Sequence, residues 1–191
     1  LYPSRTARLA LRAWREEDRS AFAAMNADAR VMEFYPAPLT DAESQALMER
    51  IRDATAEESA DLLDRIRDEF STEGFGPYAV ERLSDNELLG YVGLHRVTSS
   101  GGLEGQIEIG WRLRHDAWGQ GYATEAARAC IAHAAKLGIP ELVAFTFVGN
   151  GRSRRVMQKL GMTCVGEFDH PALPEGHPLR RHALYRIRTE Q

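Results

Sequence analysis

The sequence predicts an α/β fold in which one mixed sheet of about seven strands is flanked by helices. Residues 106–113 alternate apolar and polar side chains with the period of a strand, and residues 121–138 repeat apolar side chains at helical spacing. After Gly138 and Pro140 end this helix, a short apolar strand follows at 142–148. A strand, a helix and a strand in this order usually form a right-handed parallel crossover, which brings the carboxyl ends of both strands together.

The N-terminal part of the chain predicts a strand, a helix and a turn. Residues 8–14 alternate apolar and polar side chains, and the acidic residues behind them favour a helix over 16–28. Two prolines then stop any regular element and leave Phe34 and Tyr35 near a turn. These two aromatic side chains fit either ordinary packing or the lining of a substrate mouth.

The middle of the chain predicts helical structure followed by an antiparallel meander. Residues 41–73 are highly charged and contain neither Pro nor Gly, which predicts two helices, or one helix that leaves the core midway. Their acidic excess fits a solvated face, with attraction of a cationic amine as the alternative. Residues 78–83 and 88–97 form a predicted hairpin, and the strand at 106–113 extends it into a meander.

The C-terminal part predicts one more helix and two strands. Asn150 is a natural N-cap for a helix over 151–160, and Gly161 ends that helix. Two final strands, near 163–168 and 182–188, enclose a loop rich in Pro and Gly.

Composition limits the class of protein. With 43% hydrophobic and 27% charged residues, the chain fits a single domain over residues 1–191 that buries its own core. The net charge of −4 gives nucleic acid and membrane surfaces no overall attraction, so we expect neither as a partner. The chain shows no apolar run of membrane-spanning length and no apolar core of a signal peptide, so we expect a cytoplasmic protein.

Cysteine and histidine spacing gives no sign of a metal site. Cys130 and Cys164 form neither a disulfide framework nor a ligand pair, and we predict that both are reduced residues of the core. The six histidines show no HxH or HExxH spacing, so we expect no metal.

The turn between the central strand and its helix is suited to an anion. Gly119 and Gly121 let the backbone turn tightly and approach a ligand, and the helix behind them starts with unpaired amides and a partial positive charge. A phosphate or pyrophosphate fits this arrangement, and a plain tight turn before a core helix is the alternative. Thr124 stands where a dinucleotide fingerprint needs a third glycine, and the Gly-Lys-Ser/Thr of a P-loop is absent from the sequence.

Two motifs, WGQGYATEA and NGRSRRVMQKLGM, together with the order of elements, resemble the GNAT superfamily of acyl-CoA-dependent N-acetyltransferases. The resemblance is closest to the branch that includes the RimJ and RimL ribosomal-protein acetyltransferases. Trp118 stands where the superfamily usually has Gln or Arg, as is usual in this branch. The other residues that match the family motifs are Gly119, Gly121, Ala123, Asn150, Ser153, Lys159, Leu160, Gly161 and Met162.

The resemblance implies the GNAT fold, a mixed and mostly antiparallel sheet of about seven strands with a β-α-β core that binds acyl-CoA. It also implies acetyl-CoA as co-substrate, a primary amine as acceptor, no metal and, by family habit, a homodimer. The coenzyme's pantetheine arm would pair beside the central strand, and its pyrophosphate would rest on the glycine turn. The implied cofactor-binding residues are Trp111, Arg112, Leu113, Trp118, Gly119, Gln120, Gly121, Tyr122, Ala123, Thr124, Asn150 and Ser153. Arg152, Arg154 and Arg155 would meet the outer phosphate or remain solvated.

Transfer to an amine needs a group that removes a proton, because the reference pKa of an alkylamine is about 10.4. Glu108 is the candidate base, directly or through a water, and its alternative role is to order neighbouring residues. A backbone N–H near Trp111 would polarise the thioester carbonyl. With Phe34 and Tyr35, Glu108 forms the predicted substrate site.

The leaving thiolate needs a proton or a hydrogen bond, since the reference pKa of a thiol is near 8.5. Many superfamily members use a tyrosine on the last conserved helix, and here Met157 takes that position. Ser153, which matches the serine of the RimJ and RimL branch, is the implied replacement, and a local helix hydrogen bond is its alternative role.

Two functions remain open from the sequence. One is an acetyltransferase that acts on a primary amine by direct transfer in a ternary complex. The other is a catalytically inactive acyl-CoA-binding module with a regulatory role. A protein N-terminus, an antibiotic, a polyamine and an amino acid all fit as the acceptor.

Overall fold

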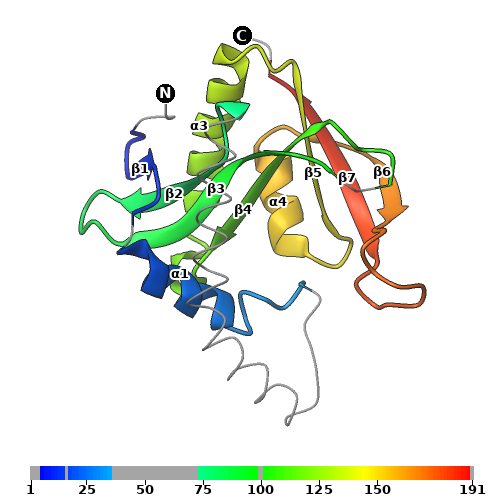
Figure 1. Ribbon diagram of the computed structural model, residues 1–191, viewed down its shortest axis with the longest axis horizontal. Coiled ribbons are helices and arrows are strands. Elements are labelled where there is room, and N and C mark those ends of the chain that lie inside the picture. Colours follow the sequence, from blue (N-terminus) through cyan, green and yellow to red (C-terminus); the bar gives the residue numbers. More distant parts are fainter. Residues whose placement is uncertain (1–4, 16, 36–72, 99–100, 190–191) are drawn as a thin grey trace.

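The computed structural model describes residues 5–15, 17–35, 73–98 and 101–189 of the chain (Figure 1). Seven strands of this part form one sheet. The strands are β1 (Leu9–Arg12), β2 (Pro77–Arg82), β3 (Leu88–Arg96), β4 (Ile107–Leu113), β5 (Glu141–Phe147), β6 (Thr163–Asp169) and β7 (Arg181–Arg188). The helices are α1 (Asp18–Ala27), the short 3-10 helix η1 (His115–Ala117), α3 (Tyr122–Lys136) and α4 (Gly151–Lys159).

The sheet confirms the predicted antiparallel meander and the parallel crossover. Its order is β1-β2-β3-β4-β5-β7-β6, in which β4 and β5 are parallel and the other neighbours are antiparallel. The strand predicted at 8–14 ends earlier, at Arg12, because Trp14 leaves the sheet. The Trp14 indole N–H donates to the carbonyl oxygen of Pro77 at 2.7 Å, and its ring packs edge-on against Phe22.

The two parallel strands separate soon after they meet. They share one register pair, Glu108 with Val143, whereas β3 and β4 are paired along the whole of β4. Beyond Glu108, β4 and β5 diverge toward their carboxyl ends (Figure 1). The backbone of residues 109–113 therefore has a strand partner on the β3 side, while its other edge faces the gap between the diverging strands.

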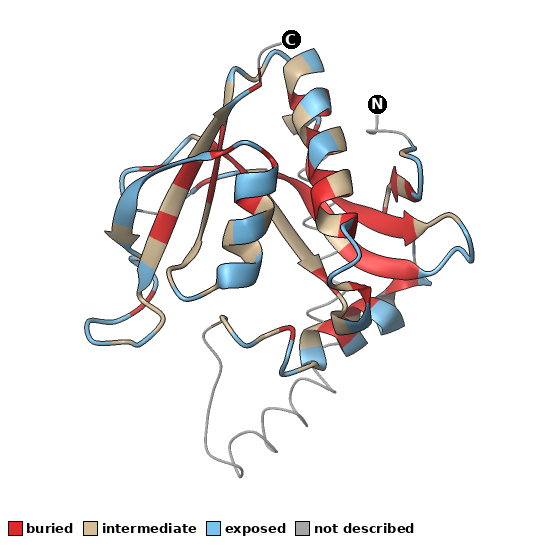
Figure 2. Cartoon of the chain, turned by 180° about the vertical axis from the view of Figure 1, so that it is seen from behind, coloured by how far each residue is buried: buried red, intermediate tan, exposed pale blue. Residues whose placement is uncertain are grey.

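The helices cover the two faces of the sheet unequally. α3 and α4 lie side by side on one face, as Figure 2 shows, and α3 packs on β3 and β4. The apolar side chains of β4, Ile107, Ile109 and Leu113, point into the core on this side. α1 covers part of the opposite face, where Phe22 and Met25 pack in a second, smaller apolar cluster. Glu108 therefore lies on the face of β4 opposite its apolar side chains, as predicted.

The prediction for the two cysteines is right for one and wrong for the other. Cys130 on α3 is fully buried, and burial raises the pKa of its thiol. Cys164 is exposed, so the expectation that it belongs to the core was wrong. The reason is its strand: β6 is the last strand of the sheet, and most of its side chains are open to solvent.

The helices predicted over 41–73 fall almost entirely outside the described residues. Among the helices that the structure does describe, none combines the length and the apolar character that crossing a membrane requires.

Candidate active site

Two cavities meet where β4 and β5 diverge. The larger, of about 580 Å³, lies over the face of the sheet that carries Glu108, and we call it the sheet cavity. The smaller, of about 340 Å³, lies over the glycine turn and the first turns of α3 and α4, and we call it the turn cavity. The residues that line both cavities are Phe34, Tyr35, Trp111, Arg112, Asn150 and Ser153.

The turn cavity is lined by residues that the resemblance to the GNAT superfamily implies for cofactor binding. All of the implied cofactor-binding residues line it except Gln120, whose side chain instead donates to the carbonyl oxygen of Asp116 at 2.8 Å. Gly119 and Gly121 have φ of +75° and +82°, a backbone region that other residues rarely adopt. No side chain caps the N-terminus of α3, so its first amides remain available to an anion.

Two anchors hold the glycine turn in place. At one end, the Trp118 indole N–H donates to the carbonyl oxygen of Leu113, the last residue of β4, at 2.8 Å. At the other, the Arg8 guanidinium donates to the carbonyl oxygen of Gln120 at 3.0 Å and to the Glu125 carboxylate at 2.7 Å. Burial works against ionisation of Glu125, but hydrogen bonds from Thr6 and Arg8 hold its pKa below the ordinary value. Side chains far apart in sequence thus fix the shape of this turn.

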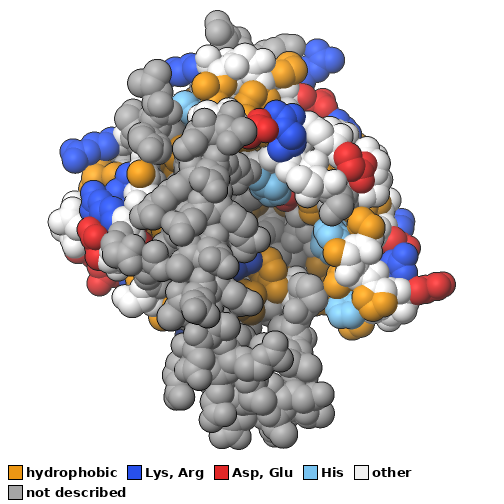
Figure 3. Space-filling view, viewed as in Figure 1, with side chains coloured by type: hydrophobic (Ala, Val, Ile, Leu, Met, Phe, Trp, Pro, Cys, Tyr) orange, Lys and Arg blue, Asp and Glu red, His pale blue; other side chains and the backbone are white. Residues whose placement is uncertain are grey.

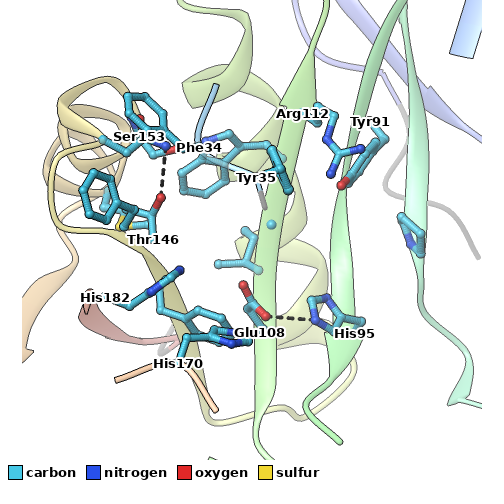
Figure 4. A pocket seen from close by; sticks show the side chains of 18 of the residues that line it. Phe34, Tyr35, Tyr91, His95, Glu108, Arg112, Thr146, Ser153, His170 and His182 are labelled. Carbon is cyan, nitrogen blue, oxygen red and sulfur yellow. Dashed lines mark hydrogen bonds and ion pairs between the residues drawn. The ribbon is translucent and has the colours of Figure 1, made fainter. Parts of the chain in front are cut away.

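The start of α4 confirms the predicted N-cap. The Asn150 side-chain oxygen accepts from the backbone N–H of Ser153 at 3.1 Å, and its amide donates to the Thr146 hydroxyl at 3.0 Å. This pairing ties α4 to the end of β5. It places Ser153 where the two cavities join (Figure 4).

Glu108 stands in the sheet cavity with a histidine beside it. The residue is 9% exposed, and its carboxylate lies 2.9 Å from Nε2 of His95, its cross-strand neighbour on β3 (Figure 4). The side chain of His95 is 45% exposed. A buried carboxylate is therefore linked through one imidazole to solvent.

Two further histidines line the same cavity as Glu108. The rings of His170 and His182 are 4.9 Å apart and pack with Phe145 and Phe168, and both line the sheet cavity. Burial lowers the pKa of both imidazoles, which favours their neutral forms. Figure 3 views this face of the molecule, where histidine and apolar side chains gather around a hollow.

Sequence reasoning missed these three histidines. They come from β3, from the loop before β7 and from β7 itself, so no local spacing reveals that they meet. The hairpin register was the one usable signal, since it sets His95 opposite Glu108. The described residues contain no group of three or more side chains that could hold a metal ion.

The two predicted aromatic residues reach both cavities. Phe34 packs against Phe147 at the end of β5, with ring centres 5.8 Å apart. Tyr35 lies over the Arg112 guanidinium, 4.0 Å from its ring centre. The side chain of Arg112, a residue implied for the cofactor, therefore turns toward the Glu108 face of the sheet, where it also meets Tyr91 (Figure 4).

The three arginines of α4 differ in their surroundings. Arg152 stacks on Trp118 at 4.7 Å and pairs with Glu33, and Arg155 lines the turn cavity together with Lys159. Arg154 points elsewhere, because it donates to the carbonyl oxygen of Val148 and to the Tyr185 hydroxyl. Cationic side chains are thus available at the turn cavity, but Arg154 is engaged with β7.

A curated protein from Aspergillus fumigatus is similar to part of the chain. The FsC-acetyl coenzyme A-N(2)-transacetylase of Aspergillus fumigatus is 41% identical over 64 residues, which are 33% of this chain and 27% of that protein. The match thus spans about a quarter of the relative's length.

Solved structures share the fold. An acetyltransferase of the GNAT family from Bacillus anthracis superposes with a TM-score of 0.71 at 24% identity and covers 100% of both chains. RimJ of Mycobacterium smegmatis, in complex with CoA-disulfide, gives 0.71 at 20% identity over 94% of this chain and 81% of that one. The ribosomal L7/L12 alpha-N-protein acetyltransferase RimL gives 0.69 at 17% identity over 96% and 91%.

Comparison with protein families agrees with these structures. The acetyltransferase (GNAT) domain matches residues 8–163, which include β1 to β5, the glycine turn and α4. The chain therefore belongs to the GNAT family of acetyltransferases.

Proposed function

We propose that this acetyltransferase moves an acetyl group from acetyl-CoA to a primary amine by direct transfer in a ternary complex. The observation that carries the proposal is the meeting of two cavities at the gap between β4 and β5, one over a glycine turn and the other around a buried glutamate. The name of the Aspergillus fumigatus relative, an acetyl coenzyme A transacetylase, and the CoA-disulfide bound to RimJ support the choice of donor.

The turn cavity is the proposed coenzyme site. The free edge of β4 at 111–113 offers backbone groups for the pantetheine arm to pair with, as an added strand does. The pyrophosphate would lie on the amides of residues 119–124, and Arg155 and Lys159 supply positive charge at the cavity wall. The thioester would then sit in the gap, facing the sheet cavity.

Glu108 is the proposed base. An amine must lose its proton before it attacks, and the Glu108 carboxylate, which lines the sheet cavity, would accept that proton. His95, in contact with Glu108 and half exposed, provides a route for that proton to reach solvent. The amine nitrogen then bonds to the thioester carbon, and the carbon–sulfur bond breaks.

Two groups serve the oxyanion and the leaving thiolate in this proposal. A backbone N–H near Trp111, at the free edge of β4, would stabilise negative charge on the carbonyl oxygen. The Ser153 hydroxyl, at the junction of the cavities, would donate to the departing sulfur, which takes up one proton to become free CoA.

The test is thiol release from acetyl-CoA across a panel of amines and N-terminal peptides. We expect turnover with at least one acceptor, and a loss of about 100-fold or more in kcat for Glu108→Gln with CoA binding retained. Ser153→Ala should also lower kcat. Glu167→Gln, which changes an exposed carboxylate on β6, is the matched control and should leave turnover unchanged.

The outcomes separate the two functions that fit the fold. Turnover that is lost in Glu108→Gln and kept in Glu167→Gln supports the enzyme. Binding of CoA without turnover of any amine favours the inactive acyl-CoA-binding module. Absence of CoA binding contradicts both functions.

A further inference from the structure

Arg112 is a half-buried cation without a carboxylate partner in the described part of the chain. No Asp or Glu of that part lies within ion-pair distance of its guanidinium, although most of the ion pairs found there join an arginine to a carboxylate. Its polar partner is neutral: Nη1 donates to the Asn26 side-chain oxygen at 2.6 Å. Its Nε is buried and has no hydrogen-bond partner.

The surroundings of Arg112 form a wall of the sheet cavity. The guanidinium lies 4.0 Å from the ring centre of Tyr35 and 5.7 Å from that of Tyr91, and both tyrosines line this cavity. The stacked rings fix the plane of the guanidinium, and the contact with Asn26 on α1 fixes its direction. Within the described part of the chain, Arg112 is thus held in place by groups that carry no opposite charge.

A half-buried charge without an ionic partner among the described residues, and a buried donor without a hydrogen-bond partner, both lower the stability of a fold. A ligand that is anionic would compensate both features at once, because a carboxylate accepts two parallel hydrogen bonds from a guanidinium. The coenzyme's phosphates have their own proposed site at the glycine turn. Arg112 lines both cavities, but its guanidinium lies against Tyr91, which lines the sheet cavity and not the turn cavity, so we assign its ligand to the sheet cavity.

Arg112 and Glu108 lie four residues apart on the same face of β4, with Cα atoms about 13 Å apart by strand geometry. Figure 4 shows Glu108 toward one end of the cavity and Arg112, with its tyrosines, toward the other. We propose that the acceptor is a small primary amine that also carries a carboxylate, bound so that its amine lies on the Glu108 side and its carboxylate on Arg112. This inference rests on the proposed acetyltransferase function and names its substrate class.

The size of the site favours a small molecule. A volume of about 580 Å³ is within the range typical of small-molecule pockets. The cavity walls are largely aromatic, with one cation and one anion at separate positions, so the ligand should combine a short apolar chain with opposite charges at its two ends. A peptide with an acidic side chain near its N-terminus also carries both a primary amine and a carboxylate. The experiment below distinguishes such a peptide from a small molecule.

The test measures binding to the protein saturated with CoA, so that it does not depend on turnover. The probes are glycine, β-alanine, 4-aminobutyrate and 6-aminohexanoate, each compared by calorimetry with its own carboxamide. Two peptides, with Asp or Asn at the second position, form a separate arm. We expect the carboxylate of at least one chain length to bind about tenfold or more tightly than its amide, since charge-assisted bidentate pairs are the stronger hydrogen bonds.

Variants identify the residue responsible. With CoA kept saturating, Arg112→Gln should remove the preference for carboxylate over amide. Arg112→Lys should restore part of that preference, because the charge remains but the planar fork is lost. Tyr35→Ala, which removes the stacked ring, should weaken carboxylate binding without changing the fold around Asn26. Arg30→Gln, at an exposed arginine remote from the sheet cavity, is the control.

The proposal and the function on which it rests fail differently. Equal binding of every carboxylate and its amide, or a preference that survives in Arg112→Gln, overturns the proposal even if acetyl transfer occurs. Weakened CoA binding in Arg112→Gln also overturns it, because Arg112 would then serve the coenzyme. A preference confined to the Asp peptide assigns the site to a protein substrate and overturns the small-molecule class. Carboxylate preference without turnover of any amine leaves the binding site in place and contradicts the enzyme.

Discussion

Arg12 shows how one residue can hold a region of this fold together. Its guanidinium lies 2.7 Å from both Asp18 at the start of α1 and Glu81 on β2, and all three side chains are largely buried. Burial opposes ionisation of Asp18, but hydrogen bonds from Arg12 and from the backbone N–H of Arg15 hold its pKa below the ordinary value. Asp18 therefore stays charged, and Arg12 is the cation that both carboxylates share.

We predict that Arg12→Gln lowers the free energy of unfolding by about 3–5 kcal/mol, because it leaves the buried Asp18 carboxylate without a cation and Glu81 with only the half-exposed Arg15. Urea unfolding at pH 7 measures the change. Arg15→Gln is the matched control: the side chain of Arg15 is 50% exposed, so its pair with Glu81 should contribute less than about 1 kcal/mol. Similar losses in the two variants would contradict this account.

His95 is the second residue with a specific expectation. If His95 carries the amine's proton from Glu108 to solvent, His95→Ala and His95→Gln should both lower kcat by roughly tenfold or more and leave the KM for acetyl-CoA unchanged. Glutamine keeps a hydrogen-bond donor for the carboxylate but cannot relay a proton. Recovery of kcat in His95→Gln would therefore show that His95 only positions Glu108.

At the scale of elements, the glycine turn depends on the N-terminal strand. Arg8 does not line the turn cavity, yet it holds the Gln120 carbonyl and the Glu125 side chain from behind and lies over the Tyr122 ring. We predict that Arg8→Ala raises the Kd for CoA about fivefold, since the turn amides lose their fixed orientation. Its side chain is 46% exposed, so unfolding free energy should change by less than about 1 kcal/mol. Calorimetry measures the CoA affinity, and urea unfolding measures the stability. A loss of stability with unchanged CoA affinity would refute the positioning role of Arg8.

Elements whose signal is local could be predicted from the sequence. The alternation along β4 placed Glu108 opposite the apolar side chains, and the Asn150 N-cap and the two glycines at positive φ followed from the chemistry of single turns. The features that the sequence did not predict depend on the order of the strands in the sheet. The histidines at 170 and 182 reach the cavity because β7 pairs with β5, and Cys164 is exposed because β6 lies at the sheet edge. Such long-range pairings leave no local periodicity.

For Arg112, one feature could be predicted from the sequence and another could not. Its place on the Glu108 face of β4 follows from the period of a strand, so the sequence could have predicted that Arg112 lines the sheet cavity as well as the turn cavity. The lack of a carboxylate partner in the described part of the chain could not be predicted, because it depends on which side chains α1, Tyr35 and Tyr91 bring to it.

For the whole molecule, the described histidines couple stability to pH. Burial lowers the pKa of His133 in the core and of His170 and His182 at the sheet cavity, so the native state binds fewer protons than the unfolded chain below about pH 6.5. The free energy of unfolding should therefore keep its full value above about pH 6.5. It should decrease as the pH falls from there toward the lowered pKa values of the native histidines. Asp18 and Glu125, whose pKa values are also lowered, lose their contribution only in more acidic solution, so pH 7.5 to 5.5 isolates the histidines.

The pH dependence of stability can be tested most directly at His133. Its ring packs edge-on against Tyr78 at 5.9 Å, and its buried Nε2 has no hydrogen-bond partner, so a proton there would be unpaired in the core. The loss of unfolding free energy between pH 7.5 and pH 5.5 should be smaller in His133→Phe than in the wild type. The difference amounts to at most about 1.4 kcal/mol for each pH unit over which the native and unfolded states of the wild type differ by one bound proton. His177→Ala, whose histidine carries no comparable burial, is the control and should keep the wild-type dependence. An unchanged pH dependence in His133→Phe would mean that the core accepts the proton, and that acid sensitivity arises at the sheet cavity instead.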